Sequence, residues 1–527
     1  MSKKSCPRWA VALFFAAFLV LGLLTAADYG APWDEQDEMD ILRMNLWEYA
    51  RVFGLDESAF EQRAAAGSDL TISTLTPISE SIEQDHGIAA FYPMAGVVMS
   101  ERLDEGQRSA VWHMWCWCLF TLGAYALYGC CRQLGLNRLA SLLAPVMLAL
   151  SPQFFAHGHF NNKDIVLMAL AACLLWQALR LMKKPAFGTG VLFSLFGALA
   201  ANTKVVGIAL WGLCALAVLM EQIIRRRMNG RIWAVAGVTF ASFFAFYALA
   251  TPALWADPAA FLEYLVVNAL GFQRWQNLIL FRGAVFDLTR DSLPVYYLPY
   301  MILATTPLWL LALIGMGAVW GLCHAVRHRS LPVALVWLMW ALPLGFAVLT
   351  RTTVYNGWRH FYFVYGPMLV LAVCGGARLQ KNARFKRVLS AALAVCILLG
   401  CAGLIINHPH QQAYYQPLVQ LCGEDYNELD YWNVSARDAL ETLAANTVGE
   451  ITIAPADLWT EDALKKGILL LEEETAQRFC ISEDAQYVLV NPTYQNFSGY
   501  ETAGVPVVEL RSYDQPIMQI YEKEARQ

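Results

Sequence analysis

Long runs of apolar residues alternate with short polar segments along the first three quarters of the chain. A helix that crosses a bilayer needs about 20 apolar residues. Eleven runs have roughly this length, at about 9–27, 110–130, 138–152, 164–182, 187–203, 205–223, 232–251, 296–320, 332–350, 360–377 and 388–406. The composition agrees, because 57% of the 527 residues are hydrophobic and only 15% are charged. The pattern predicts a mainly α-helical polytopic membrane protein with about eleven transmembrane helices.

Basic residues mark every second connection between these runs, which orients the chain. They lie at 132–138, 180–184, 225–231, 327–329 and 378–387. We therefore expect these connections and the N-terminus in the cytoplasm, and the C-terminus outside. The first run follows Lys3, Lys4 and Arg8, but it is as long as a full span and Thr25-Ala-Ala27 is a weak cleavage site, so we predict an uncleaved helix. No basic patch with interleaved aromatic residues indicates a nucleic-acid partner.

The pattern changes after Ile406, where a shorter polar and apolar alternation begins. We expect a helix at 435–445 and a helical run at 462–479, with strands at 450–454, 487–491, 507–510 and 517–521. Ser435-Ala-Arg-Asp438 has the form of a capping box. The predicted organisation is a transmembrane domain, 1–408, with long outer loops at 28–108 and 252–295, followed by a small extracytoplasmic α/β domain, 409–527.

The cysteines indicate no metal site. Most of the thirteen lie within apolar runs, where cysteine is a small buried hydrophobe. Neither Cys116-Trp-Cys118 nor Cys130-Cys131 has the spacing of zinc ligands. Cys422 and Cys480 both belong to the predicted outer domain, so a disulfide between them is compatible with this location.

A cluster of carboxylates follows the first predicted span. Asp34 and Glu35 are adjacent, and Asp37, Glu38 and Asp40 come close behind them. Carboxylates at a membrane boundary can act as a general base, bind a metal or solvate a loop. We interpret Asp37 and Asp40 as solvated loop acids. The later part of the same loop, 45–53, has the aromatic residues of an interfacial helix.

Three further polar segments are predicted at the same membrane face. The short loop His157-Gly-His-Phe-Asn-Asn-Lys-Asp164 either caps the next helix or forms part of a site. Lys204, in Asn202-Thr-Lys204, either reaches to water or serves function, as ionisable residues at a membrane edge often do. The segment 351–360 ends in Arg359 and His360, where arginine suits either a lipid phosphate or an interfacial anchor.

Together these segments resemble the GT-C superfamily of polyprenyl-phosphate-sugar glycosyltransferases, specifically bacterial family 39, which is similar to the protein O-mannosyltransferases and the aminoarabinose lipid A transferases. The resemblance rests on the order and spacing of five pieces: Trp33-Asp34-Glu35, Phe155-Ala-His-Gly-His-Phe-Asn-Asn-Lys-Asp164, Asn202-Thr-Lys204, Tyr355-Asn-Gly-Trp-Arg-His360 and Leu429-Asp-Tyr-Trp432. With the predicted topology it covers most of the chain. The inserted lumenal domain of the eukaryotic mannosyltransferases is missing, which weakens the case for a protein acceptor.

The resemblance implies transfer of a sugar from a polyprenyl phosphate to an acceptor hydroxyl of an envelope glycan, lipid or protein, outside the membrane and with inversion. It implies that Asp34 is the base, with Glu35 as its neighbour. The donor phosphate would be bound by Lys204, Arg359 and His360. The sugar and acceptor pocket would be lined by His157, His159, Asn162, Lys163, Asp164 and Tyr355. Asp164 and His157 would shape this pocket or hold a metal. Related families differ in their use of a divalent metal, so the resemblance leaves the cofactor open.

Two other functions fit a polytopic protein. A lipid or solute transporter would use Lys204 and Arg359 to line a path, and a non-enzymatic envelope-assembly scaffold would use the α/β domain to bind a partner. Transporters commonly show internal repeats and helices that break near the membrane midplane. This chain instead concentrates its polar residues at one face, which favours an interfacial enzyme.

Overall fold

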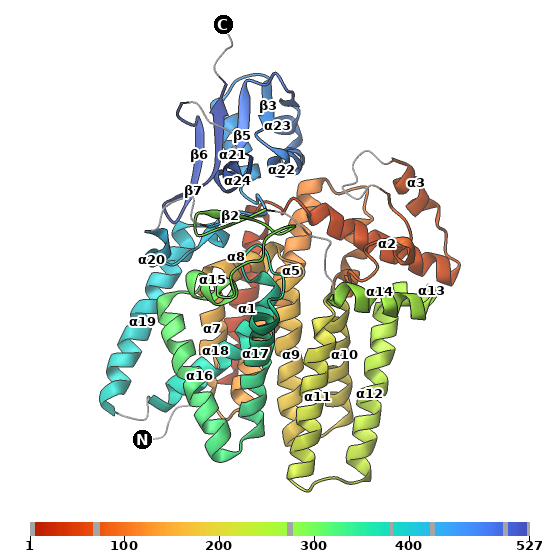
Figure 1. Cartoon of the computed structure of the whole chain (residues 1–527), viewed down its shortest axis with the longest axis vertical. Coiled ribbons are helices and arrows are strands. Elements are labelled where there is room, and N and C mark those ends of the chain that lie inside the picture. Colours follow the sequence, from red (N-terminus) through yellow and green to blue (C-terminus); the bar gives the residue numbers. More distant parts are fainter. Residues whose placement is uncertain are drawn as a thin grey trace.

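A bundle of long helices carries a small sheet domain at one end in the computed structural model of the chain (Figure 1). The structure describes residues 6–66, 74–270, 278–379, 383–421, 427–498 and 504–523. The N-terminus lies at the lower end of the bundle in Figure 1, and the C-terminus lies beyond the sheet at the upper end. The long bundle helices are α1 (Arg8–Thr25), α5 (Glu105–Gln133), α9 (Asp164–Lys183), α10 (Phe187–Thr203), α11 (Val206–Ile224), α12 (Gly230–Ala250), α16 (Leu308–His328), α17 (Leu331–Thr350), α18 (Tyr365–Leu379) and α19 (Ala383–Ile406).

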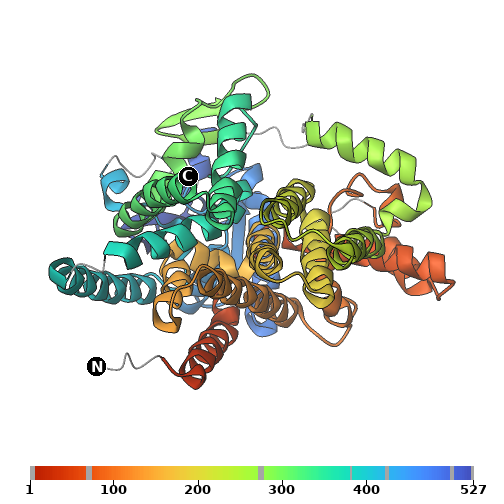
Figure 2. The same cartoon turned by 90° about the horizontal axis from the view of Figure 1, so that it is seen from below.

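Every predicted apolar run forms helix, and the prediction of a polytopic helical protein is confirmed. Within the described residues nine helices are long and apolar enough to cross a membrane, or ten if one bent pair counts as a single span. The count is lower than the predicted eleven, since α10 is a shorter apolar helix of 17 residues. Seen from below, α1 and α19 lie at the edge of the bundle (Figure 2), whereas α9 is buried along nearly its whole length.

The bent pair changes the interpretation of the predicted loop at 153–163. Helices α6 (Arg138–Ser141) and α7 (Leu143–Ala149) lead into α8 (Pro152–Phe160) through a bend of 75°. Pro152 occupies the first turn of α8, where the missing N–H of proline costs nothing. The histidine segment is therefore mostly a buried helix, not the short outer loop that the sequence predicted.

Close packing holds α9 in the centre of the bundle. Gly123 of α5 faces Ala169 of α9, and a Cβ on this glycine would lie 2.7 Å from the Cα of Ala169. Small residues at such positions let two membrane helices approach closely. The packing fixes the upper end of α9, where Asp164 begins the helix.

Short elements of the two long segments that were predicted as outer loops cover the upper end of the bundle (Figure 1). They are α2 (Glu35–Phe53), α3 (Ser58–Ala66), α4 (Ala95–Val98), α13 (Ala253–Ala256), α14 (Pro258–Leu270), β1 (Leu278–Phe281), β2 (Ala284–Asp287) and α15 (Tyr297–Thr305). Strands β1 and β2 pair as an antiparallel hairpin, and α20 (Pro417–Gln420) lies just before the sheet domain.

The acidic cluster lies on a helix, which corrects the prediction of a solvated loop. Helix α2 begins directly after Asp34 and ends at Gly54, whose φ of 64° closes it in the left-handed conformation. Asp40 is completely buried and forms an ion pair with Arg43. The predicted interfacial helix at 45–53 is the second half of α2, and Phe53 at its end is exposed.

The C-terminal domain has a five-stranded mixed sheet in the order β4-β3-β5-β7-β6. Strands β4, β3 and β5 are parallel, and β7 is antiparallel to both β5 and β6. The elements are α21 (Ala436–Asn446), β3 (Ile451–Pro455), α22 (Leu458–Leu469), α23 (Glu473–Ala476), β4 (Phe479–Ile481), β5 (Tyr487–Val490), α24 (Pro492–Ser498), β6 (Val508–Ser512) and β7 (Gln515–Glu522). The four predicted strands are present.

Two local predictions in this domain are wrong. The helical run at 462–479 is two separate helices, and its end pairs with β3 as the edge strand β4, so strand pairing overrides helix propensity there. Ser435 caps no helix, because its hydroxyl donates to the Asp430 carboxylate at 2.6 Å. A capping box does occur at α22, between Asp457 and Thr460.

The sheet domain is joined to the start of the chain by polar contacts. The Arg437 guanidinium donates to the carbonyl oxygens of Ala27, Asp28 and Tyr29. The backbone N–H of Trp33 donates to the carbonyl of Trp432 at 3.3 Å. The segment that begins the domain therefore lies directly over the N-terminal end of α2.

Candidate functional site

Asp34 lies at the N-terminal end of α2, just beyond the C-terminal end of α1. Its side chain is half-buried, makes no capping hydrogen bond to α2, and receives no hydrogen bond from another described residue. Burial, and next the charge of Glu38, raise the pKa of the Asp34 carboxyl to about 6, although Arg359 and Lys163 act in the opposite direction. A carboxylate with a pKa near neutrality and an unused proton-accepting oxygen suits a general base.

Glu35, the other member of the predicted catalytic pair, points the opposite way. It is 2% exposed, and its two oxygens accept from Ser109 Oγ and His113 Nε2 of α5, both at 2.7 Å. Adjacent residues at the start of a helix project in different directions, so the two carboxyls do not share one environment. These contacts attach the start of α2 to α5 and thereby fix the position of Asp34.

Asp164 joins two cations from distant parts of the chain. The carboxylate is fully buried at the start of α9 and forms ion pairs with Lys204, between α10 and α11, and with Arg359 Nη1 at 3.2 Å. Asn161 orients it, since Asn161 Oδ1 accepts the Asp164 N–H at 2.8 Å and Asn161 Nδ2 donates to the carboxylate at 3.3 Å. Burial lowers the pKa of Lys204, although the Asp164 charge raises it.

A second ion pair connects α9 to α2 beside Asp34. Lys163 Nζ lies 2.7 Å from Glu38 Oε1, and His86 Nε2 approaches the same oxygen at 3.8 Å. The sequence named Glu38 only as a member of the acidic cluster. Its spacing from Asp34, one helical turn, was the signal that both side chains share a face of α2.

Aromatic rings surround the Arg359 guanidinium. Its carbon lies 4.8 Å from the ring centre of Trp432, 5.1 Å from that of Tyr355 and 5.9 Å from that of Tyr431. Such rings attract a cation and exclude water from it. The ring of His360 packs edge-on against Tyr355, and His360 Nδ1 is buried without a hydrogen bond among the described residues. Tyr431 and Trp432 supported the family resemblance, but they were not predicted as site residues.

The two predicted histidines of α8 face different surroundings. Residues two apart on a helix point to nearly opposite sides. The ring of His157 lies near Trp432 and Tyr362, so it faces the same space as Arg359. His159 stacks between Tyr29 and Trp117 and contacts Thr25, which places it against α1 and α5.

Two asparagines complete the predicted segments. Asn162 is half-buried, and its amide nitrogen has no hydrogen bond among the described residues. Asn202 has a structural role, since its side chain accepts the N–H of Ala89 at 2.9 Å and donates to the carbonyl of Ala250 at 3.0 Å. Two residues before Lys204, Asn202 therefore connects the segment at Ala89 to the end of α12 at Ala250.

The surroundings of Asp164 and His157 do not fit a metal ion. Both oxygens of Asp164 already face cations, which repel a divalent ion. His157 Nδ1 lies 3.1 Å from the Asn161 amide. In the part of the chain that the structure describes, no three His, Cys, Asp or Glu side chains gather as ligands. Cys480 is an exposed free thiol, and its suggested partner Cys422 lies outside the described residues.

Glu428 is a buried carboxyl that the sequence did not indicate. It is 4% exposed, its Oε2 accepts from Asn356 Nδ2 at 3.3 Å, and its Oε1 has no hydrogen bond among the described residues. Burial raises the pKa of Glu428 to about 8, against smaller lowering effects of Asn356, the Leu280 N–H and Arg359. The segment that carries Tyr431 and Trp432 therefore begins with a carboxyl that is protonated at neutral pH.

We expect Glu428→Gln to flatten the pH dependence of stability. The pKa of Glu428 is about 8 in the folded protein and about 4.3 in the unfolded chain. The protonated carboxyl therefore contributes stability that is fully present below about pH 4.3, and this contribution is lost as the pH rises toward about 8. Glutamine keeps the shape but does not ionise. The melting temperature of the purified variant relative to wild type should therefore rise between pH 5 and pH 8. A constant difference across this range would show that Glu428 is not protonated in the folded protein.

Comparisons with known proteins were made for sequence and for fold. Residues 105–255 match the family model described as dolichyl-phosphate-mannose-protein mannosyltransferase. This segment runs from α5 to α13 and contains Lys163, Asp164 and Lys204. Comparison with curated protein sequences gives no match.

Two solved structures share the fold over nearly the whole chain. ArnT from Cupriavidus metallidurans in the apo state is 15% identical, with a TM-score of 0.51 and coverage of 97% of this chain and 98% of that one. The same protein bound to undecaprenyl phosphate is 14% identical, with a TM-score of 0.50 and 98% coverage of both chains. At this identity the likeness concerns the fold. Over residues 105–255 the chain is therefore similar to the dolichyl-phosphate-mannose-protein mannosyltransferase family, and its overall fold is the fold seen in ArnT.

Proposed function

We propose that the protein transfers a sugar from a polyprenyl phosphate to an acceptor hydroxyl at the outer face of the membrane, with inversion at the sugar carbon. The observation that carries the proposal is the position of Asp34, whose free carboxylate lies beside a cluster of three cations, Lys163, Lys204 and Arg359. A base and a phosphate-binding group side by side are what this transfer requires. The bound undecaprenyl phosphate of ArnT, which shares the fold, supports this donor class.

The chemistry follows from the two charges. The acceptor hydroxyl gives its proton to Asp34 as its oxygen attacks the anomeric carbon. The bond from that carbon to the phosphate oxygen breaks, and the electron pair leaves with the polyprenyl phosphate. The phosphate then gains a second negative charge, which Lys204 and Arg359 stabilise, with His360 nearby. Attack from the face opposite the phosphate inverts the anomeric centre.

The surroundings of the cations support a role in the transition state. Asp164 holds Lys204 and Arg359 in position before the donor binds, so little reorganisation is needed when charge develops on the phosphate. The rings around Arg359 exclude water and strengthen its attraction for an anion. His157, Tyr355 and Trp432 supply polar and aromatic surfaces of the kind that bind a sugar.

The direct test is transfer by the purified full-length protein in liposomes. A polyprenyl phosphate with a radiolabelled sugar is supplied together with an envelope extract as the acceptor. We expect the label to move from the lipid into the extract, with release of polyprenyl phosphate. A transporter would instead move the labelled lipid between leaflets without cleaving it, and a scaffold would do neither.

We expect Arg359→Lys to weaken donor binding by roughly tenfold, since lysine keeps the charge but loses the planar fork and the stacking on Trp432. Binding of polyprenyl phosphate can be measured by its retention on the purified protein in detergent. The exposed Arg329→Lys at the opposite end of the bundle is the matched control. Unchanged affinity in Arg359→Lys would make this arginine an interfacial anchor only.

We expect the C-terminus to lie outside the cytoplasm, because every predicted cytoplasmic connection is basic. A reporter that is active only in the cytoplasm, fused after Gln527, should give no signal. The same reporter inserted at the basic turn between α11 and α12 should be active. The reverse pattern would invert the orientation and place the proposed site at the inner face.

A further inference from the structure

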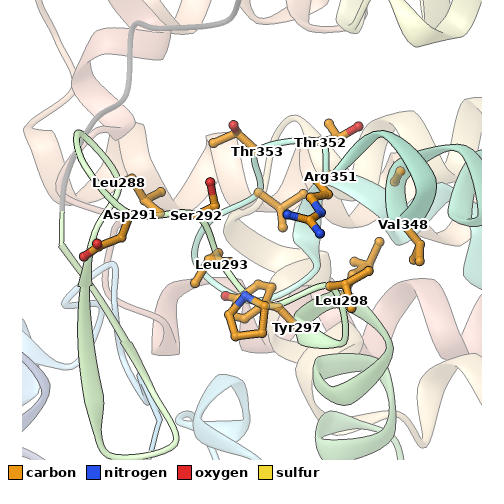
Figure 3. Close-up of a pocket in the computed structure, with 14 residues that line it drawn as sticks. Leu288, Asp291, Ser292, Leu293, Tyr297, Leu298, Val348, Arg351, Thr352 and Thr353 are labelled. Atoms are coloured by element: carbon orange, nitrogen blue, oxygen red, sulfur yellow. The ribbon is translucent and has the colours of Figure 1, made fainter.

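A pocket opens at the C-terminal end of α17 (Figure 3), and no residue of the cation cluster lines it. It has a volume of about 150 Å³ and lies between two walls. One wall is the segment from Leu288 to Leu298, which leads from the β-hairpin into α15, and the other is the end of α17 with Arg351 to Val354. Nothing in the proposed sugar transfer uses these residues.

Arg351 supplies the positive charge of this pocket. It follows the last residue of α17, and its φ of 53° places it in the left-handed conformation. Figure 3 shows its guanidinium directed into the space between the walls. Within the described chain the Arg351 side chain forms no hydrogen bond or ion pair. Arg351 is exposed, and a guanidinium without a counter-charge beside a small pocket can bind an anion.

The acid that also lines the pocket does not cancel this charge. Figure 3 shows the Asp291 carboxylate turned away from Arg351. It accepts the backbone N–H of Asp287 at 3.1 Å and so belongs to the turn that follows β2. The hydroxyl groups of Ser292 and Thr353 add neutral donors, one from each wall.

The pocket has both polar and apolar lining. Arg351, beyond the end of α17, and Ser292 line it together with Leu298 and with Ala347 and Val348 of the last turn of α17. The neighbouring Leu349 is 85% exposed at the end of a helix that crosses the bundle. A cation beside apolar lining, next to a helix face with the exposed side chains of Leu342, Phe346 and Leu349, suits a lipid head group and its acyl chains better than a soluble anion.

We propose that this pocket binds the phosphate of an anionic phospholipid in the outer leaflet, with Arg351 as the phosphate ligand. The acyl chains would extend down the exposed apolar face of α17. The proposal does not depend on sugar transfer. A bound lipid would hold one end of the 351–359 segment, whose other end carries Arg359, a member of the cation cluster.

The test measures lipid retained on the purified full-length protein by native mass spectrometry. Phosphatidylglycerol and phosphatidylcholine with identical acyl chains are supplied in equal amounts. We expect wild type to retain phosphatidylglycerol preferentially, and Arg351→Gln to retain roughly tenfold less of it, as expected for loss of a charge-assisted bond. Arg329→Gln is the matched control, since Arg329 also ends a helix, α16, in the left-handed conformation but at the opposite end of the bundle.

Three outcomes would overturn the proposal. The first is retention by Arg351→Gln equal to that of wild type. The second is an equal loss in Arg329→Gln, which would indicate general charge attraction. The third is displacement of phosphatidylglycerol by excess inorganic phosphate, which would indicate a site for the free anion. Arg351→Lys guards against a folding defect, because it should keep most of the preference for the anionic lipid if the pocket is intact.

Discussion

Replacing Asp34 by Asn should reduce sugar transfer by roughly 100-fold or more, the order of magnitude expected when a general base is lost. Asparagine keeps the shape and the hydrogen-bonding capacity but takes no proton at neutral pH. The cations and their partners remain in place, so binding of polyprenyl phosphate should persist. The measurement is the initial rate of label transfer in liposomes, with donor binding measured separately.

The pH profile gives this prediction a second readout. The base works in its deprotonated form, so the wild-type rate should rise as pH increases through about 6 and then level off. Asp34→Asn should lose this limb. Asp37→Asn, in the same first turn of α2, is the charge-matched control and should keep it. If Asp34→Asn turns over normally while Glu35→Gln is inactive, Glu35 is the base and our assignment within the pair is wrong.

Replacing Asp164 by Asn should impair both stability and turnover. The substitution leaves Lys204 and Arg359 without their shared counter-charge, and an unpaired buried charge costs about 3–5 kcal/mol. We expect a melting temperature several degrees lower and transfer reduced by roughly 100-fold, since the two cations are no longer held in position. Donor affinity should not fall, because the pocket has become more positive.

We expect Asp164→Asn to lower turnover without lowering donor affinity. This difference distinguishes a loss of cation positioning from a general loss of structure. Asp438→Asn is the matched control, since this carboxylate pairs with Arg437 at 2.8 Å and His410 at 3.2 Å, away from the cation cluster. It should lower stability with little effect on transfer by the folded fraction. Turnover by Asp164→Asn that matches wild type per folded molecule would show that Lys204 and Arg359 need no positioning residue.

The sequence by itself determined the features that depend only on residues close together along the chain. A run of apolar residues forms helix in a membrane whatever surrounds it, because every backbone N–H and C=O must then be paired within the segment. The bundle helices were predictable for this reason. Four strands of the C-terminal sheet were predictable from short runs of strand-forming residues. The polar segments that meet at Asp34 were also recognisable, because each interrupts or borders an apolar run.

The tertiary structure decided which of those polar residues face one another. The bend before α8 turned a predicted loop into a buried helix, so His157 and His159 point to different neighbours. Asp40 is buried in an ion pair with Arg43, and Glu35 is buried against His113 of α5. Pairing across more than a hundred residues brought Arg359 to Asp164. Such contacts depend on long-range packing and on the free-energy cost of leaving a buried charge unpaired. Neither can be deduced from a short stretch of sequence.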